Sequence, residues 1–273
     1  DKSAAWAKEH LVVMVGHPRS GTTHQHTSLA SHPLVASSTM VEAAAPSLWL
    51  SSCLGTPNWL LNIFDSKKHR ISAEEKLEEH YWLIALFKTD VTCYFLNILE
   101  PELLKELDYL DEPDLWFLAR CLRRRVFRAT RQGKKAYVAR PLSITAFLDK
   151  LDKYVPDYRV ILARREPADA IRSFQALLRV VFPKISSQFL DEIADSHAKM
   201  YLDAIPVIAE KRSPCVMEFD DWRKTSKEHP EPLERLLSFS LGDNWEKGTD
   251  ASLYLADQTE ERSTPETEGK KDK

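Results

Sequence analysis

Residues 11–31 decide the fold: Leu11-Val-Val-Met-Val-Gly16 is followed by His17-Pro-Arg-Ser-Gly-Thr-Thr-His24 and by a stretch from Gln25 to Ser31. The first run is apolar and rich in β-branched residues, which predicts a buried parallel strand. The segment after it contains proline, glycine and threonine, which predict a turn that opens a helix. A helix N-terminus favours anions through its free N–H groups and its dipole. We therefore predict an anion-binding loop here.

The glycine spacing strengthens this prediction. Gly16-x-x-x-x-Gly21-Thr22-Thr23 has the spacing of a P-loop, except that Thr22 replaces the lysine and Arg19 supplies a cation from inside the loop. The chain has only 7 glycines in 273 residues, and two of them bracket this loop. Glycine alone indicates only turn geometry, but strand, loop and helix together favour an anion site.

Length and composition fit one large α/β domain. The chain has 273 residues, of which 43% are hydrophobic, so it can bury a large core. Its formal net charge of −3 gives no electrostatic footprint for nucleic acid, so we expect no nucleic-acid partner. No apolar run reaches the length of a membrane span, and we expect no membrane segment in this chain.

The cysteines and asparagines bear on the compartment. The cysteines lie far apart without metal-type spacing, and no asparagine belongs to a glycosylation sequon. Both observations favour a cytoplasmic location. A Golgi-lumen location stays open if an amino-terminal anchor has been removed.

Strand-like and helix-like segments alternate along the chain, which predicts a parallel sheet with right-handed crossovers and a three-layer α/β/α fold. We expect strands at 34–39, 135–140, 159–164 and 214–219, and helices at 71–87, 102–110, 113–130, 144–154, 167–181 and in a region ending near Leu241. Residues 1–256 form a single predicted domain, with a helical insertion at 46–133 that can wall an acceptor pocket. The charged tail at 257–273 is predicted to be disordered.

Two further features carry charge. Glu42 follows the second predicted strand, at the sheet edge where ligand groups gather, although a solvated loop carboxylate is an equal alternative. The predicted helix at 113–130 and the residue after it carry a cluster of arginines that either meets a phosphate or coats a solvated face, and the solvated face is favoured. The cluster consists of Arg120, Arg123, Arg124, Arg125, Arg128 and Arg131.

A second candidate phosphate motif follows a later strand. Arg165 stands at the end of the strand 159–164, Pro167 opens the next helix, and Ser173 lies on that helix. An arginine fork and a hydroxyl across such a turn can hold a phosphate. Taken alone, this motif favours an ordinary capped helix with Arg165 in a surface ion pair.

Together the two motifs resemble the cofactor signature of sulfotransferases that use 3′-phosphoadenosine 5′-phosphosulfate (PAPS). Pro18-Arg-Ser-Gly-Thr-Thr23 resembles their 5′-phosphosulfate loop, and Arg165-Glu-Pro167 through Ser173 resembles their 3′-phosphate motif. Further segments resemble the branch with tyrosylprotein and many bacterial-type sulfotransferases, namely His32-Pro33, Val155–Val160, and Glu218–Trp222 with the helix at 230–239. The resemblance covers roughly residues 11–45 and 130–245.

The resemblance implies a set of site residues. The phosphosulfate would be held by Pro18, Arg19, Ser20, Gly21, Thr22 and Thr23, the 3′-phosphate by Arg165 and Ser173, and the adenine would lie near Phe219. Glu42 lies near the position of the general base in the tyrosylprotein branch. Arg140 replaces a strand-end lysine of that branch, which keeps the charge and changes the donor geometry.

These roles fit the chemistry of group transfer. Sulfuryl transfer depends on in-line positioning and on charge stabilisation, which Arg19 and Arg140 would supply. Glu42 would take the proton of a hydroxyl or amine on a small-molecule, glycan or peptide acceptor, with His17, His24 or His26 as alternative bases. The expected cofactor is PAPS, with PAP as its product and no metal.

Two other functions remain open. A P-loop kinase of small molecules fits the glycine spacing, but the chain lacks the loop lysine and a convincing strand that ends in a Mg²⁺-binding aspartate. A non-catalytic nucleotide-binding homologue also fits, because arginine stands at both Arg19 and Arg140, where a catalytic lysine would be expected.

Overall fold

The computed structural model describes residues 5–37, 65–66, 69–70, 112–140, 145, 148–155, 157–181, 183–245 and 250–255. Its strands are β1 (Leu11–Gly16), β2 (Val35–Ala36), β3 (Asp65–Ser66), β4 (His69–Arg70), β5 (Ala136–Ala139), β6 (Arg159–Arg164) and β7 (Cys215–Glu218). Its α-helices are α1 (Ala5–His10), α2 (Thr22–Ser31), α9 (Glu112–Arg131), α10 (Leu148–Asp152), α11 (Pro167–Val181), α12 (Ser187–Arg212), α13 (Phe219–Arg223) and α14 (Glu231–Leu241). Two short 3₁₀ helices follow at Gly242–Asn244 and Ala251–Tyr254.

The central sheet has five parallel strands in the order β2-β5-β1-β6-β7. β1 is the middle strand, and Val13 pairs with Ala139 of β5 on one side and with Val160 of β6 on the other. All the residues of β1 are buried, as the apolar run predicts for a strand covered on both faces. β3 and β4 pair antiparallel with each other.

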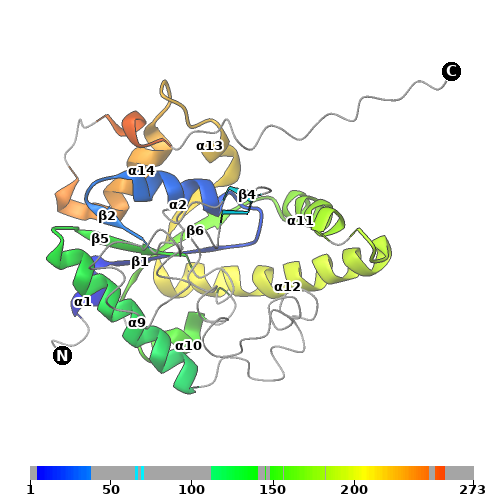
Figure 1. Cartoon of the computed structure of the whole chain (residues 1–273), viewed down its shortest axis with the longest axis horizontal. Helices are drawn as coiled ribbons and strands as arrows, with labels where there is room; N and C mark the ends of the chain where they lie inside the picture. Colours follow the sequence, from blue (N-terminus) through cyan, green and yellow to red (C-terminus); the bar gives the residue numbers. More distant parts are fainter. Residues whose placement is uncertain are drawn as a thin grey trace.

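Side chains of β1 alternate between two hydrophobic clusters, one on each face of the sheet. Val13 and Val15 pack in a cluster with residues of α1, α9 and α10, whereas Val12 and Met14 pack with residues of α2 and α14. Figure 1 shows these two helical layers on opposite sides of the strands, with the long α12 on the same side as α9. The three-layer α/β/α prediction is confirmed.

The helices α11 and α12 pack against each other through a smaller cluster. It contains Phe174 and Leu178 of α11 with Leu190, Ile193 and Ala194 of α12. In Figure 1 this pair extends from the sheet on the side away from β2. α11 starts just after the carboxyl end of β6, and its residue Ser173 contacts Arg19 in the loop that follows β1.

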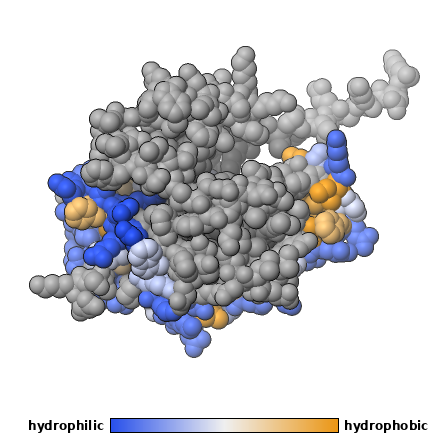
Figure 2. Space-filling view, turned by 60° about the horizontal axis from the view of Figure 1, so that its bottom comes forward, coloured by the Kyte–Doolittle hydropathy of each residue, from blue (hydrophilic) through white to orange (hydrophobic). Residues whose placement is uncertain are grey.

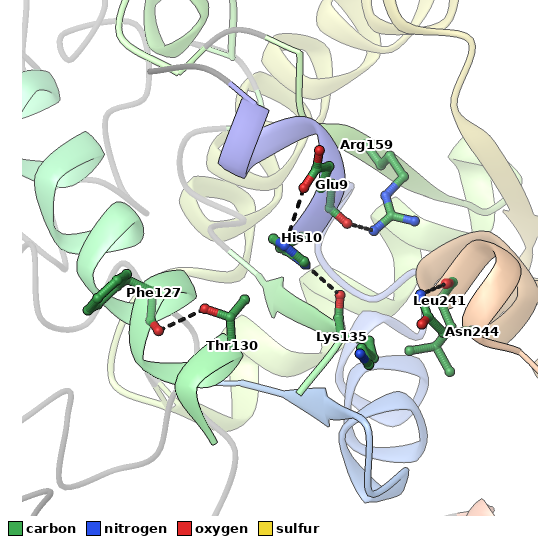
Figure 3. A network of polar contacts seen from close by, with 8 residues as sticks. All are labelled: Glu9, His10, Phe127, Thr130, Lys135, Arg159, Leu241 and Asn244. Carbon is green, nitrogen blue, oxygen red and sulfur yellow. Dashed lines mark hydrogen bonds and ion pairs between the residues drawn. The ribbon is translucent and has the colours of Figure 1, made fainter. Parts of the chain in front are cut away.

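Polar contacts with backbone carbonyls fix the amino ends of the middle strands (Figure 3). His10 donates from Nδ1 to the Lys135 carbonyl oxygen at 3.1 Å, just before β5. Arg159, the first residue of β6, donates to the carbonyl oxygens of Glu9 at 2.9 Å and Phe239 at 3.0 Å. These contacts join α1, β5, β6 and α14 at the edge opposite the loop.

Several predicted bounds match the structure closely. The strand 159–164 and the helix 167–181 are found as predicted, and the helix 113–130 is α9. The helix predicted at 144–154 is described only as Leu148–Asp152. The 26-residue helix α12 was not predicted from the sequence.

Other predictions fall outside the described residues. They are the helices at 71–87 and 102–110, most of the insertion at 46–133, and the tail at 257–273. Within the part of the chain that the structure does describe, none of the helices is both long and apolar enough for a membrane span.

Candidate functional site

The loop between β1 and α2 has an unusual backbone. Arg19 and Gly21 have positive φ angles of 71° and 82°, and a Cβ at Gly16 would collide with the carbonyl oxygen of Ala163 in β6. The amide and the hydroxyl of Ser20 both donate to the His17 carbonyl oxygen, at 3.2 and 2.6 Å. The Ser20 hydroxyl therefore shapes the loop from inside, while the exposed side chain of Arg19 is directed outward.

The first turn of α2 has backbone donors that point along the helix axis. Helix geometry leaves the N–H groups of Thr22 and Thr23 without acceptors inside the helix. Gly21 is the N-cap residue and provides no side-chain cap. An anion at this position would accept hydrogen bonds from these N–H groups and would also lie at the positive end of the helix dipole.

The two predicted phosphate motifs meet at this loop. Arg19 donates from Nε to the Ser173 hydroxyl at 3.2 Å, and Arg165 donates from Nη1 to the carbonyl oxygen of Arg19 at 2.9 Å. Residues that are separated by about half of the chain thus form one group at the carboxyl edge of the sheet. Arg19 of the first motif contacts both Ser173 and Arg165 of the second.

Phe219 closes one side of this group. The Arg165 guanidinium lies over its ring at 4.2 Å from the centroid, and that of Arg223 at 5.9 Å. A Cβ at Gly21 would come within 3.0 Å of the Phe219 ring, so only glycine allows this close approach. Phe219 is half-buried and keeps part of its surface for a ligand.

The charge of this group is positive. Burial lowers the pKa of Arg165, and the neighbouring charges of Arg19 and Arg223 lower it further, while Asp169 and Asp220 oppose them. An arginine stays protonated in such surroundings. Mutual repulsion among these guanidinium groups would be relieved by a bound anion.

Arg140 follows β5 and reaches the loop from another strand. It is 3% exposed, and its Nη1 donates to the Thr23 hydroxyl at 2.6 Å. Thr22 is buried and Thr23 is exposed, so of the two threonines Thr23 is the one that presents its surface. The structure thus brings Arg140 to the predicted phosphosulfate loop.

The three histidines near the loop differ in their environments. His26 is fully buried and its Nε2 lies 3.3 Å from the Val138 carbonyl oxygen. His17 is 3% exposed. Its Nδ1 donates to the Pro18 carbonyl oxygen at 2.5 Å. Burial, assisted by the charge of Arg165, lowers the pKa of His17 despite that bond.

His24 is held by a residue that the sequence did not indicate as its partner. Trp222 of α13 donates from its indole nitrogen to Nδ1 of His24 at 2.8 Å. The neutral ring then carries its proton on Nε2, so neither nitrogen can accept another proton while this bond lasts. This contact argues against His24 as the general base.

Gln25 and Arg223 were also not identified from the sequence. Gln25 lies under the loop with its Nε2 3.6 Å from the Cβ position of Gly21, and neither amide atom has a partner among the described residues. Only Trp222, within the motif Glu218–Trp222, gave a sequence signal. The predicted base Glu42 lies outside the described residues.

Comparison with known proteins places this geometry in context. The profile of a group described as "Sulfotransferase family" matches residues 12–215. The structure resembles that of sulfotransferase STF9 from Mycobacterium avium, with 15% identity, a TM-score of 0.63, and coverage of 91% of this chain and 67% of that one. It also resembles sulfotransferase STF1 from Mycobacterium tuberculosis H37Rv, with 16% identity, a TM-score of 0.61, and coverage of 93% and 72%. No curated protein sequence matches significantly.

Proposed function

The chain belongs to the sulfotransferase family, and we propose that it transfers the sulfuryl group of PAPS to a hydroxyl or amine of an acceptor. The family accounts for sulfuryl transfer in general. The donor, the acceptor and the residues that act are our proposal. It takes the acceptor to be a small molecule, a glycan or a peptide.

One observation carries this proposal: Arg19, Ser173 and Arg165 form a continuous hydrogen-bonded group beside the start of α2. PAPS has phosphate-type anions at two positions of its ribose, and this group offers cations and hydroxyls on both sides of one loop. Phe219, covered by the Arg165 guanidinium, offers an aromatic surface in the same place. The residues present therefore fit such a ligand.

The chain's own residues would act mainly by position and charge. The N–H groups of the first turn of α2 and the Thr23 hydroxyl would hold the phosphosulfate, and Arg165 with Ser173 would hold the 3′-phosphate. When bound, PAPS supplies the sulfuryl group. Arg19 and Arg140 would stabilise the negative charge that develops on the oxygens around the sulfur.

We propose Glu42 as the residue that accepts the acceptor proton. His24 and His26 are engaged in hydrogen bonds, and His17 is buried. Glu42→Gln should leave PAP affinity unchanged and lower single-turnover rates at saturating PAPS by roughly 10²–10⁴-fold. The matched variant His17→Gln should retain most of its turnover, and the opposite pattern would move the role to His17.

A binding experiment tests the cofactor assignment without any acceptor. Calorimetry with PAP, and separately with ATP plus Mg²⁺, should give binding of PAP in the presence of EDTA. Arg165→Ala should weaken PAP binding by about 1.5–3 kcal/mol, because it removes a charge-assisted hydrogen bond. The control is Arg172→Ala on α11, the helix that follows Arg165, where the arginine is exposed and pairs with Asp169. Tight binding of ATP with Mg²⁺ and none of PAP would instead support a kinase.

A further inference from the structure

A second pocket lies at the β2 edge of the sheet, away from the loop. Its volume is about 230 Å³, and it is formed by the end of α2, the strand β2, the last turns of α9 and the turn before β5. Ala30, near the end of α2, lines it, whereas the loop precedes the first residue of that helix. Helix geometry puts these two positions roughly 12 Å apart along the axis.

The polar lining of this pocket is cationic. Arg125, Arg128 and Lys134 line it together with Ser37, Gln132 and Tyr137. The described lining residues include no aspartate or glutamate. Lys134 donates to the Pro33 carbonyl oxygen at 2.6 Å and Arg125 donates to the Tyr137 hydroxyl at 3.2 Å. These contacts with neutral oxygens fix both cations in place.

Ser37 gives an independent indication of a ligand. It follows β2, is 8% exposed, and its hydroxyl has no hydrogen-bond partner among the described residues. Buried hydroxyls are normally paired, because an unpaired one loses its hydration without compensation. An acceptor bound in the pocket would receive this hydrogen bond.

The arginine cluster of α9 divides into two groups in the structure. Arg120, Arg123, Arg124 and Arg131 are exposed, as a solvated face requires, whereas Arg125 and Arg128 are half-buried and line the pocket. Figure 2 shows strongly hydrophilic side chains gathered on the side of the molecule where α9 ends. The solvated-face interpretation of the cluster thus holds for the exposed group only.

We propose that this pocket binds the oxyanion of a sulfate or phosphate group, either as the free ion or as a monoester of a small molecule. Arginine and lysine would supply the charge, and Ser37 would donate from its hydroxyl. The volume accommodates such a group together with part of the molecule that carries it. This site is independent of the transfer chemistry proposed above.

Residue-resolved NMR distinguishes the two anion sites. Inorganic sulfate is titrated into ¹⁵N-labelled protein at constant ionic strength, and glucose 6-sulfate and glucose are titrated separately. The amides of Ala129, Gln132 and Tyr137 should shift with saturation, separately from any shift at residues 19–23. Tighter binding of glucose 6-sulfate than of sulfate identifies a monoester ligand, and equal binding identifies the free ion.

Matched variants test which side chains bind the anion. Three substitutions should each weaken sulfate binding at the pocket by about tenfold, namely Arg128→Gln, Lys134→Gln and Ser37→Ala. Each removes a hydrogen bond to the anion, and hydrogen bonds to charged groups are among the stronger ones. Arg124→Gln removes the same charge from the exposed face of α9 and should change the affinity by less than about twofold. Shifts confined to residues 19–23, or equal weakening by Arg124→Gln and Arg128→Gln, would overturn the proposal.

Discussion

The two edges of the central sheet use their cations in different ways. At the amino edge, Arg159 and His10 donate to backbone carbonyl oxygens and join neighbouring elements. At the carboxyl edge, Arg19 and Arg165 lie close to each other, and neither amide atom of the buried Gln25 has a hydrogen-bond partner among the described residues. The cations at the amino edge hold the strands together, whereas those at the carboxyl edge form a positively charged group that an anion can bind.

The comparison shows that arginines near the two ends of the same strand have different roles in this fold. Arg159 begins β6 and Arg165 directly follows it. Arg159 donates to carbonyl oxygens of α1 and α14, whereas Arg165 donates to the carbonyl oxygen of Arg19 in the loop after β1. Unsatisfied and strained groups commonly gather at functional sites, where they cost stability. Variants at each edge should therefore separate stability from binding.

The largest effect is expected from Gly16→Ala at the carboxyl edge. The added Cβ would collide with the Ala163 carbonyl oxygen between β1 and β6, so the free energy of unfolding should fall by roughly 3 kcal/mol or more. Gly133→Ala near the amino edge is the control. Gly133 also has a positive φ, of 79°, but nothing lies within 4 Å of its Cβ position, so the loss should be about 1 kcal/mol. Urea unfolding measures both losses, and equal losses of the free energy of unfolding for the two variants would contradict the expected collision.

The next effect compares Arg159, the first residue of β6, with Arg165, which directly follows that strand. Arg159→Ala removes two hydrogen bonds to carbonyl oxygens and should lower the free energy of unfolding by roughly 1–3 kcal/mol, with PAP affinity unchanged. Arg165→Ala should leave the free energy of unfolding within about 1 kcal/mol of the original, since the lost hydrogen bond to Arg19 is offset by relief of the repulsion from Arg19 and Arg223, while PAP affinity falls. Urea unfolding measures the stability of both variants, and calorimetry measures their PAP affinity. If both variants lost the same one of these two properties, the proposed difference between the edges would be wrong.

A smaller effect is expected from Trp222→Phe, which keeps an aromatic ring beside His24 and removes the indole donor. The free energy of unfolding should fall by about 1 kcal/mol, because the part-buried hydrogen bond to His24 is lost. Thr130→Val removes a hydrogen bond to the Phe127 carbonyl oxygen on the exposed end of α9 and should cost less than about 0.5 kcal/mol. Thermal unfolding of the two variants gives the comparison. A larger loss for Thr130→Val would show that α13 does not fix His24.

The smallest effect is a change in the pKa of one histidine, His17, with His32 as its control. Burial lowers the pKa of both, with the charge of Arg165 contributing at His17 and that of Lys134 at His32. An anion that neutralises a neighbouring cation favours the protonated imidazole, so PAP should raise the pKa of His17 and leave His32 unchanged. Imidazole NMR titrations measure both groups. Equal movement would mean that PAP does not distinguish the two edges.

The carboxyl edge could be predicted from sequence because its signals are local. The strand, the turn and the helix start between Leu11 and Ser31 are contiguous, and the same holds for the segment from Arg159 through Ser173. Local patterns could not predict the contacts between segments that are distant in the sequence. The bond from Trp222 to His24 joins residues 198 positions apart, and no periodicity indicates such a pair.

The helix α12 was missed for a physical reason. It contains Pro206 and packs against both α11 and the sheet, through residues such as Leu190 and Ile208. Apolar residues therefore occur on more than one of its faces, which weakens the helical period. The pocket beside β2 was missed because burial, which separates Arg125 and Arg128 from the exposed arginines, depends on the folded sheet.

The central position of β1 has a consequence for synthesis of the chain. β1 leaves the ribosome well before its neighbours β5 and β6, which begin at Ala136 and Arg159. An apolar strand must therefore remain unpaired while more than a hundred further residues are translated, and closing such long loops is slow. We expect the nascent chain to depend on chaperones that shield this strand. The middle of the sheet, and with it the loop after β1, can assemble only after β6 has been translated.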